Sequence, residues 1–109
     1  MSKKLFGSLV VMVAATSFAT CATAGQVDVD QKDLQFVPNA VSIKAGDTVR
    51  FRDTDRIAHD VTIVNPDGTS DDKGMDQYNE NIVVSFAKAG IYHVRCRIHP
   101  DMKMTVTVD

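Results

Sequence analysis

The feature that most constrains the fold is an alternation of apolar and polar residues with a period of two, which recurs along most of the chain. Apolar residues occupy every second position in six segments: Val27 and Val29; Val49 and Phe51; Val61 and Ile63; Ile82, Val84 and Phe86; Tyr92, Val94 and Cys96; and Met104, Val106 and Val108. This is the period of a strand with one buried face, and no ten-residue window shows the period of a helix. The sequence therefore predicts an all-β protein.

Turn-forming residues separate these segments. Turns are predicted at 44–47, 65–68 and 88–90, each of which contains a glycine. The longest polar stretch, Asn65 to Asn79, carries four aspartates and no alternation, so we expect it to be a solvated connection. Six or more short strands in a chain of this length predict a small antiparallel sandwich or Greek-key barrel.

The first 24 residues have the three-part pattern of a secretory signal. Lys3 and Lys4 precede an uncharged run from Leu5 to Ala15, and small residues end the segment at Ala24. The apolar run is shorter than the roughly 20 residues that a membrane-spanning helix needs. We therefore expect cleavage after Ala24, a periplasmic protein and no membrane insertion after processing. A lipid anchor on Cys21 is the weaker alternative.

Processing would leave a single domain, residues 25–109, with one cysteine, Cys96, and a formal net charge of -4 in place of -2. A net negative charge argues against nucleic acid as a partner. Two cysteines in the whole chain exclude a disulfide-dense scaffold, a four-cysteine zinc site and an iron–sulfur cluster. An unpaired thiol in an exported protein indicates an intermolecular disulfide, a reactive thiol or a metal ligand.

The segment that follows Cys96 favours the metal ligand. Within nine residues the chain places a thiolate, the imidazole of His99 and the thioethers of Met102 and Met104. His59, at the start of a predicted strand, is the candidate for a further ligand. Two imidazoles, one thiolate and a weak thioether suit both Cu(I) and Cu(II), so an electron can arrive or leave with little rearrangement.

At this point the chain resembles the cupredoxins, the type 1 blue copper proteins, and among them is most similar to amicyanin, pseudoazurin and plastocyanin. The resemblance rests on a Cys-x-x-His-Pro-x-Met loop that begins at Cys96. It also rests on an upstream block that runs from Phe36 through Gly46-Asp47 to Phe51 and is followed by His59-x-Val61. The two blocks lie in the family's order, and together they cover nearly all of residues 27–109.

The resemblance implies a Greek-key β-sandwich of about seven or eight strands that binds one copper ion. It implies His59, Cys96 and His99 as equatorial ligands and Met102 as the axial ligand. Met104 is the alternative axial ligand, at the longer spacing of plastocyanin and pseudoazurin. The parity of Met104 with Val106 and the proline after His99 favour Met102.

The function that the resemblance implies is one-electron transport in the periplasm by an electron carrier and not an enzyme. The expected protein is a monomer that meets transient redox partners, such as a periplasmic dehydrogenase and a c-type cytochrome. In the family, the exposed edge of the second histidine is the electron port, and Ile98, Pro100, Ala58 and Pro38 could supply its apolar surroundings.

Two positions depart from the family. Asp60 stands where asparagine is usual, and its carboxylate cannot donate the hydrogen bond that ties the ligand loops together. We therefore expect a lowered or pH-dependent reduction potential. Arg97-Ile98 replaces a common Thr-Pro pair, which bears on the rigidity of the loop.

Other residues near the motif have simpler interpretations. His93 has the opposite strand parity to Cys96 and is expected to face solvent. Arg56, Arg97 and Lys103 predict either a cationic rim that steers an acidic partner or scattered solvated charges.

Two other functions fit parts of the pattern. One is a carrier or reservoir that transfers Cu(I) itself, with Met102 and Met104 both serving as soft ligands. The other is a cysteine–histidine hydrolase that uses Cys96 and His99, for which a sandwich this small leaves little room for a substrate cleft.

Overall fold

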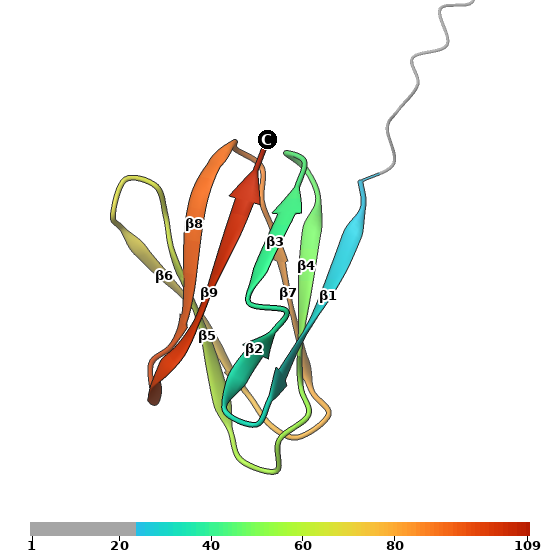
Figure 1. Ribbon diagram of the computed structural model, residues 1–109, viewed down its shortest axis with the longest axis vertical. Helices are drawn as coiled ribbons and strands as arrows, with labels where there is room; N and C mark the ends of the chain where they lie inside the picture. The colour runs from blue at the N-terminus through green and yellow to red at the C-terminus, as the bar shows by residue number, and fades with distance from the viewer. Residues whose placement is uncertain (1–23) are drawn as a thin grey trace, which may run out of the picture.

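The computed structural model describes residues 24–109, which form two packed β-sheets (Figure 1). The strands run in the order β1 (Gln26–Lys32), β2 (Gln35–Val37), β3 (Ala40–Ile43), β4 (Thr48–Asp53), β5 (His59–Val64), β6 (Ser70–Asp76), β7 (Asn81–Ser85), β8 (Gly90–Cys96) and β9 (His99–Val108). One sheet has the strand order β2-β1-β4-β7 and the other β3-β9-β8-β5-β6. This is the predicted β-sandwich, and the described residues contain no helix able to span a membrane.

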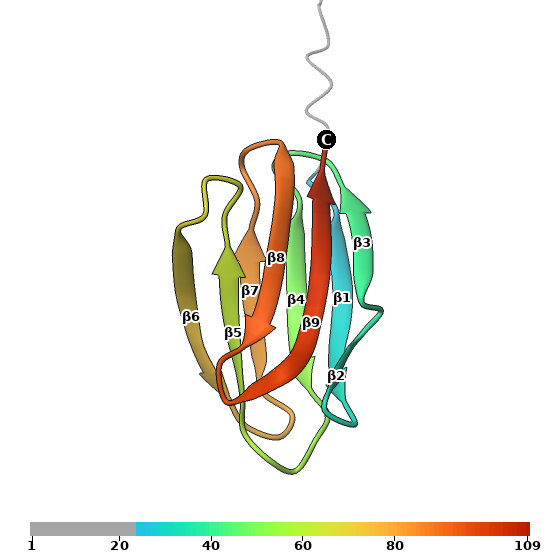
Figure 2. The ribbon, with the colours of Figure 1, turned by 60° about the vertical axis from the view of Figure 1, so that its left-hand side comes forward.

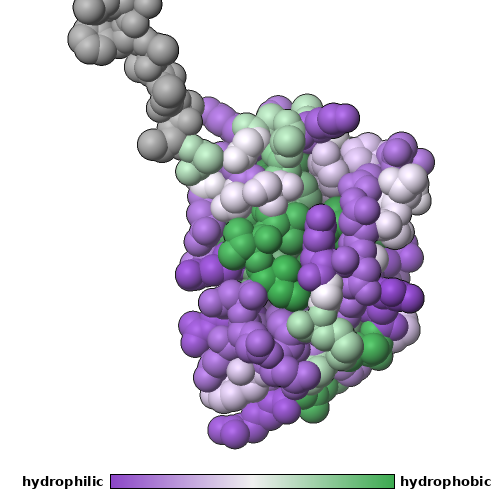
Figure 3. All heavy atoms as spheres, turned by 180° about the vertical axis from the view of Figure 1, so that it is seen from behind, coloured by the Kyte–Doolittle hydropathy of each residue, from purple (hydrophilic) through white to green (hydrophobic). Residues whose placement is uncertain are grey.

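The core lies between the sheets and is made by the alternating residues. Val29, Val49, Phe51, Val61, Val94 and Val106 are all completely buried, with Phe36, Ile63, Val84, Phe86, Met104 and Val108 nearly so. The predicted strand parities are therefore confirmed. The face seen in Figure 3 is mostly hydrophilic, with apolar side chains gathered near its middle and again near its lower edge.

The predicted turns are also confirmed. Residues 44–47 join β3 to β4, where Gly46 has a φ of 95° that favours glycine, and the Asp47 carboxylate accepts hydrogen bonds from the amides of Gly25 and Lys44. Residues 65–68 begin the connection from β5 to β6, and residues 88–90 lie where β7 leads into β8.

The nine strands of residues 24–109 are close to the number expected, but two other expectations about the sheets were wrong. The sandwich is mixed and not antiparallel, because β1 pairs with β4 and β3 with β9 in parallel. The polar stretch 65–79 is not only a connection, since it contains β6, which pairs with β5 from Ser70 to Asp76. Nearly every β6 side chain is exposed, so this edge strand is held by backbone hydrogen bonds and leaves no alternating pattern.

The topology gathers several chain connections at one end of the sandwich (Figures 1 and 2). The β4–β5 loop, the β8–β9 turn, the β1–β2 turn and the β6–β7 loop all lie there, opposite the C-terminus. We call this the ligand end, because His59, Cys96 and His99 all occupy strand termini at it.

Candidate metal centre

Adjacent strands bring three of the predicted donors together. His59 begins β5, Cys96 ends β8 and His99 begins β9. β8 is hydrogen-bonded to both β5 and β9, so the strand termini that carry these residues lie side by side. Cys96 and His99 are also paired across the two-residue turn that joins β8 to β9.

The donor atoms form a compact triangle. The Nδ1 atoms of His59 and His99 are 3.1 Å apart, and the Sγ atom of Cys96 is 3.5 Å from Nδ1 of His99 and 4.0 Å from Nδ1 of His59. The point in their plane that is equidistant from all three atoms lies about 2.1 Å from each, close to the zinc–nitrogen and zinc–sulfur bond lengths of about 2.0–2.3 Å in proteins. The residues present therefore fit a bound transition-metal ion.

Both candidate methionines are buried on the inner face of β9. The register pairs Met104 with Val94 and Lys103 with Arg95, which places Met102 nearer the Cys96–His99 turn than Met104. Met104 thus continues the core row of β9, as its parity predicted. The register favours Met102 as the thioether beside the triangle.

His59 is held by a carboxylate that the sequence analysis missed. Its Nε2 atom donates to Oδ2 of Asp55 at 2.8 Å, which leaves the lone pair on Nδ1 directed at the other donors. Asp55 also accepts hydrogen bonds from the amides of Asp33 and Leu34. Burial alone would raise the pKa of Asp55, but these hydrogen bonds outweigh it and lower the pKa. The signal was a carboxylate four residues before the histidine.

Asp60 connects the two ligand segments through its backbone amide, which donates a hydrogen bond, and through its carboxylate, which accepts. Its backbone amide donates to Sγ of Cys96 at 3.3 Å, and its Oδ1 atom accepts from the amide of Arg97 and the hydroxyl of Thr62. The side chain at position 60 thus still ties the two segments together, but Asp60 accepts the hydrogen bond where asparagine would donate one. This hydrogen bond also anchors the turn at Arg97. Burial, followed by the interaction with Asp72, raises the pKa of Asp60.

Only one of the three donor residues, His99, approaches solvent. His59 and Cys96 are 0% and 1% exposed, whereas His99 is partly exposed. Exposed apolar side chains follow in the neighbouring connections, Ile57 in the β4–β5 loop and Ile98 beside His99. Pro38 and Pro100 are exposed and Ala58 is partly exposed.

The remaining candidate residues lie apart from the triangle. His93 is exposed on β8, as predicted. Arg97 forms an ion pair with Asp72 at 3.0 Å, and the Arg56 guanidinium stacks over the Tyr78 ring at 5.0 Å. Two of the three predicted rim cations are therefore already engaged at the surface.

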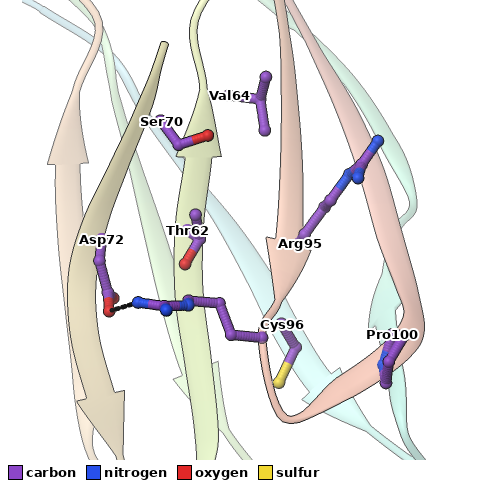
Figure 4. Close-up of a pocket in the computed structure, with 8 residues that line it drawn as sticks. Thr62, Val64, Ser70, Asp72, Arg95, Cys96 and Pro100 are labelled. Atoms are coloured by element: carbon purple, nitrogen blue, oxygen red, sulfur yellow. Dashed lines mark hydrogen bonds and ion pairs between the residues drawn. The ribbon is translucent and has the colours of Figure 1, made fainter. Parts of the chain in front are cut away.

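A groove of about 550 Å³ runs along the outer face of β6, β5 and β8 and reaches Cys96 at the ligand end (Figure 4). Asp72 and Arg95 line it from opposite sides of Thr62, and the Arg97–Asp72 ion pair crosses it. The groove is shallow and polar, unlike the enclosed cleft that a hydrolase needs.

Comparisons with known proteins agree with this geometry. Residues 23–109 match the model of the copper binding proteins, plastocyanin/azurin family. The chain is 30% identical to a plastocyanin of Ulva pertusa over 89 residues, covering 72% of this chain and 91% of the relative. It is 33% identical to amicyanin-alpha of Methylorubrum extorquens over 90 residues, covering 81% of this chain and 76% of the relative. A solved Cu(I) form of an amicyanin mutant aligns with a TM-score of 0.72 at 25% identity, over 78% of this chain and 83% of that one.

Proposed function

Because the chain belongs to the plastocyanin/azurin family of copper-binding proteins, electron carriers that are not enzymes and hold one type 1 copper per chain, we propose that it moves single electrons between periplasmic proteins. His59, Cys96 and His99 are the equatorial ligands in this proposal, and Met102 is the axial ligand.

The observation that carries the proposal is the preformed triangle of three donors. Its three donor atoms already lie at the distances that separate ligands of one metal ion. The hydrogen bonds of Asp55 and Asp60 hold the two buried donors in place. The copper ion supplies a one-electron Cu(I)/Cu(II) couple when bound. Hydrogen bonds to the ligands hold them in place, so the site changes little between Cu(I) and Cu(II) and electron transfer stays fast.

The partly exposed edge of His99 is the proposed electron port. The apolar side chains of Ile57 and Ile98 surround it with surface that a partner can cover and release quickly. A dehydrogenase as donor and a c-type cytochrome as acceptor are the partners that we propose for a monomeric carrier.

The proposed periplasmic location depends on the signal sequence. Residues 1–24 carry the predicted signal, and residues 1–23, including Cys21, lie outside the described part of the chain. The described residues contain one free cysteine, Cys96, which is buried. In an oxidising compartment, burial and a bond to copper would both protect this thiol.

Transfer of Cu(I) itself is the alternative, and the burial of the ligands disfavours it. Handing over a metal ion requires that an acceptor reach the ligands, yet only His99 approaches solvent. Voltammetry of the copper-loaded protein with and without a Cu(I) chelator separates the two functions. We expect reversible one-electron cycling and slow copper loss, whereas rapid copper loss without reversible cycling would support the transfer of Cu(I).

A further inference from the structure

A group of buried polar side chains lies behind His59, on the side away from the donor triangle. Gln31 of β1, Asp53 of β4 and Asp76 of β6 are each at most 1% exposed. Gln31 and Asp53 are paired in the parallel β1–β4 ladder, and Asp76 is paired with His59 in the β5–β6 ladder. The three side chains therefore enter the space between the sheets from both sides, at the ligand end.

Five polar atoms of these side chains lack hydrogen-bond partners, although Oδ1 of Asp53 accepts a hydrogen bond from the amide of Asp55. Both atoms of the Gln31 amide, both carboxylate oxygens of Asp76 and Oδ2 of Asp53 are buried without one. The Gln31 amide lies close enough to the Asp76 carboxyl for a long hydrogen bond that favours the ionised carboxylate, but not at full hydrogen-bond geometry. Buried polar atoms are nearly always partnered, so five unpartnered atoms in three neighbouring residues indicate that something else binds among them.

Negative charge in this group is also uncompensated. Neither Asp53 nor Asp76 forms an ion pair with Lys or Arg anywhere in residues 24–109. The nearest basic atom, Nε2 of His59, is 3.9 Å from Oδ1 of Asp53 and is already bonded to Asp55. Two buried carboxylates without a cation are costly.

The unpartnered acceptors define the kind of ligand. They are four oxygens, three from carboxylates and one from an amide, and no unused sulfur or imidazole nitrogen is among them. Such donors select a hard cation, and two carboxylates balance a double charge. Ca²⁺ takes about six to eight oxygens in flexible geometry, so backbone carbonyls or water would complete its shell around these four, whereas Mg²⁺ demands a near-ideal octahedron.

We propose that Gln31, Asp53 and Asp76 form a second metal site, separate from the copper centre, that binds Ca²⁺ through oxygen ligands. The ion would join β1 and β4 of one sheet to β6 of the other and would brace the strand that carries His59. Nothing in the proposed electron transport requires this site.

Thermal unfolding of the copper-loaded protein with added CaCl₂ tests the proposal, with MgCl₂ and NaCl at equal ionic strength as comparisons. Asp76→Asn is the informative variant, because neither carboxylate oxygen has a hydrogen bond to lose. Asp101→Asn removes an exposed carboxylate and is the matched control. Isothermal calorimetry with CaCl₂ gives the Kd directly.

We expect Ca²⁺ to raise the unfolding midpoint of the wild type and of Asp101→Asn. At a Ca²⁺ concentration 100 times Kd, the unfolding equilibrium constant should fall about 100-fold. Asp76→Asn should be more stable than the wild type without Ca²⁺, because it removes one of two repelling charges, and should lose the response to Ca²⁺. A wild type that ignores Ca²⁺, an equal response to Mg²⁺, or an unchanged response in Asp76→Asn would overturn the proposal.

Discussion

The hydrogen bond between Asp55 and His59 links the stability of the fold to the metal site, so one substitution should weaken both. In Asp55→Ala, Nε2 of completely buried His59 loses its partner, which costs about 1–3 kcal/mol. The amides of Asp33 and Leu34 lose theirs too, but these exposed groups can bond to water, at about 0.5 kcal/mol each. The total loss of stability should be about 2–4 kcal/mol, a fall in the melting temperature of roughly 10–25 °C for a domain of this size.

The affinity for copper should fall in the same variant by about 10- to 100-fold, because the imidazole is no longer oriented by its outer hydrogen bond. Asp67→Ala is the matched control, since Asp67 also accepts hydrogen bonds within a turn, from the amide and the hydroxyl of Thr69, but far from any ligand. It should lose about 1 kcal/mol of stability and no copper affinity. The assays are denaturant unfolding of the apoprotein and competitive copper titration. Equal copper affinities in the two variants would refute the reasoning.

The pH dependence of this effect has a definite sign. The pKa of Asp55 is lowered in the folded protein, so its contribution to stability is present above the ordinary Asp pKa of about 3.9 and is lost as the pH falls through the folded value. The difference in stability between the wild type and Asp55→Ala should therefore shrink in acid.

Three further predictions concern the other residues of the ligand end. Met102→Ala and Met104→Ala should each cost about 2–5 kcal/mol of stability because both side chains are buried, but only Met102→Ala should change the reduction potential and the visible spectrum; the reverse pattern would assign Met104 as the axial ligand. Burial raises the pKa of Asp60, so protonation in mild acid should remove a negative charge near the thiolate and raise the midpoint potential, and Asp60→Asn should abolish that rise; identical potential–pH curves for the two proteins would contradict this. Arg97→Glu should slow electron transfer with an anionic redox reagent and weaken its dependence on salt, while Lys88→Glu in the β7–β8 connection should have little effect; equal rates would show that Arg97 does not steer.

The sequence patterns were most informative where burial imposes a period. The inward residues of β4, β8 and β9 follow from alternation alone, because a strand with one buried face leaves that mark in its residues. β6 leaves no such mark, since its pairing with β5 uses backbone atoms that every residue has. The parallel pairings of β1 with β4 and β3 with β9 likewise depend on which strands become neighbours, and local sequence does not encode this.

The donor residues could be predicted because their chemistry is rare and their spacing is short. Asp55, Gln31, Asp53 and Asp76 were missed as a group around His59 because three different strands and a loop supply them. Gln31 shares the inward parity of Val29, but a polar residue at that position looks like the exposed end of a strand until the structure shows that it is buried. The gathering of these residues around His59 is thus visible only in three dimensions.

The central claim is that Cys96 bonds to copper in a type 1 centre, and the optical and electron paramagnetic resonance spectra of the oxidised, copper-loaded protein test it most directly. The account predicts intense thiolate-to-copper absorption in the visible range and the narrow hyperfine splitting of a type 1 site, both lost in Cys96→Ser. A colourless oxidised protein, or a spectrum that Cys96→Ser leaves unchanged, would contradict the account.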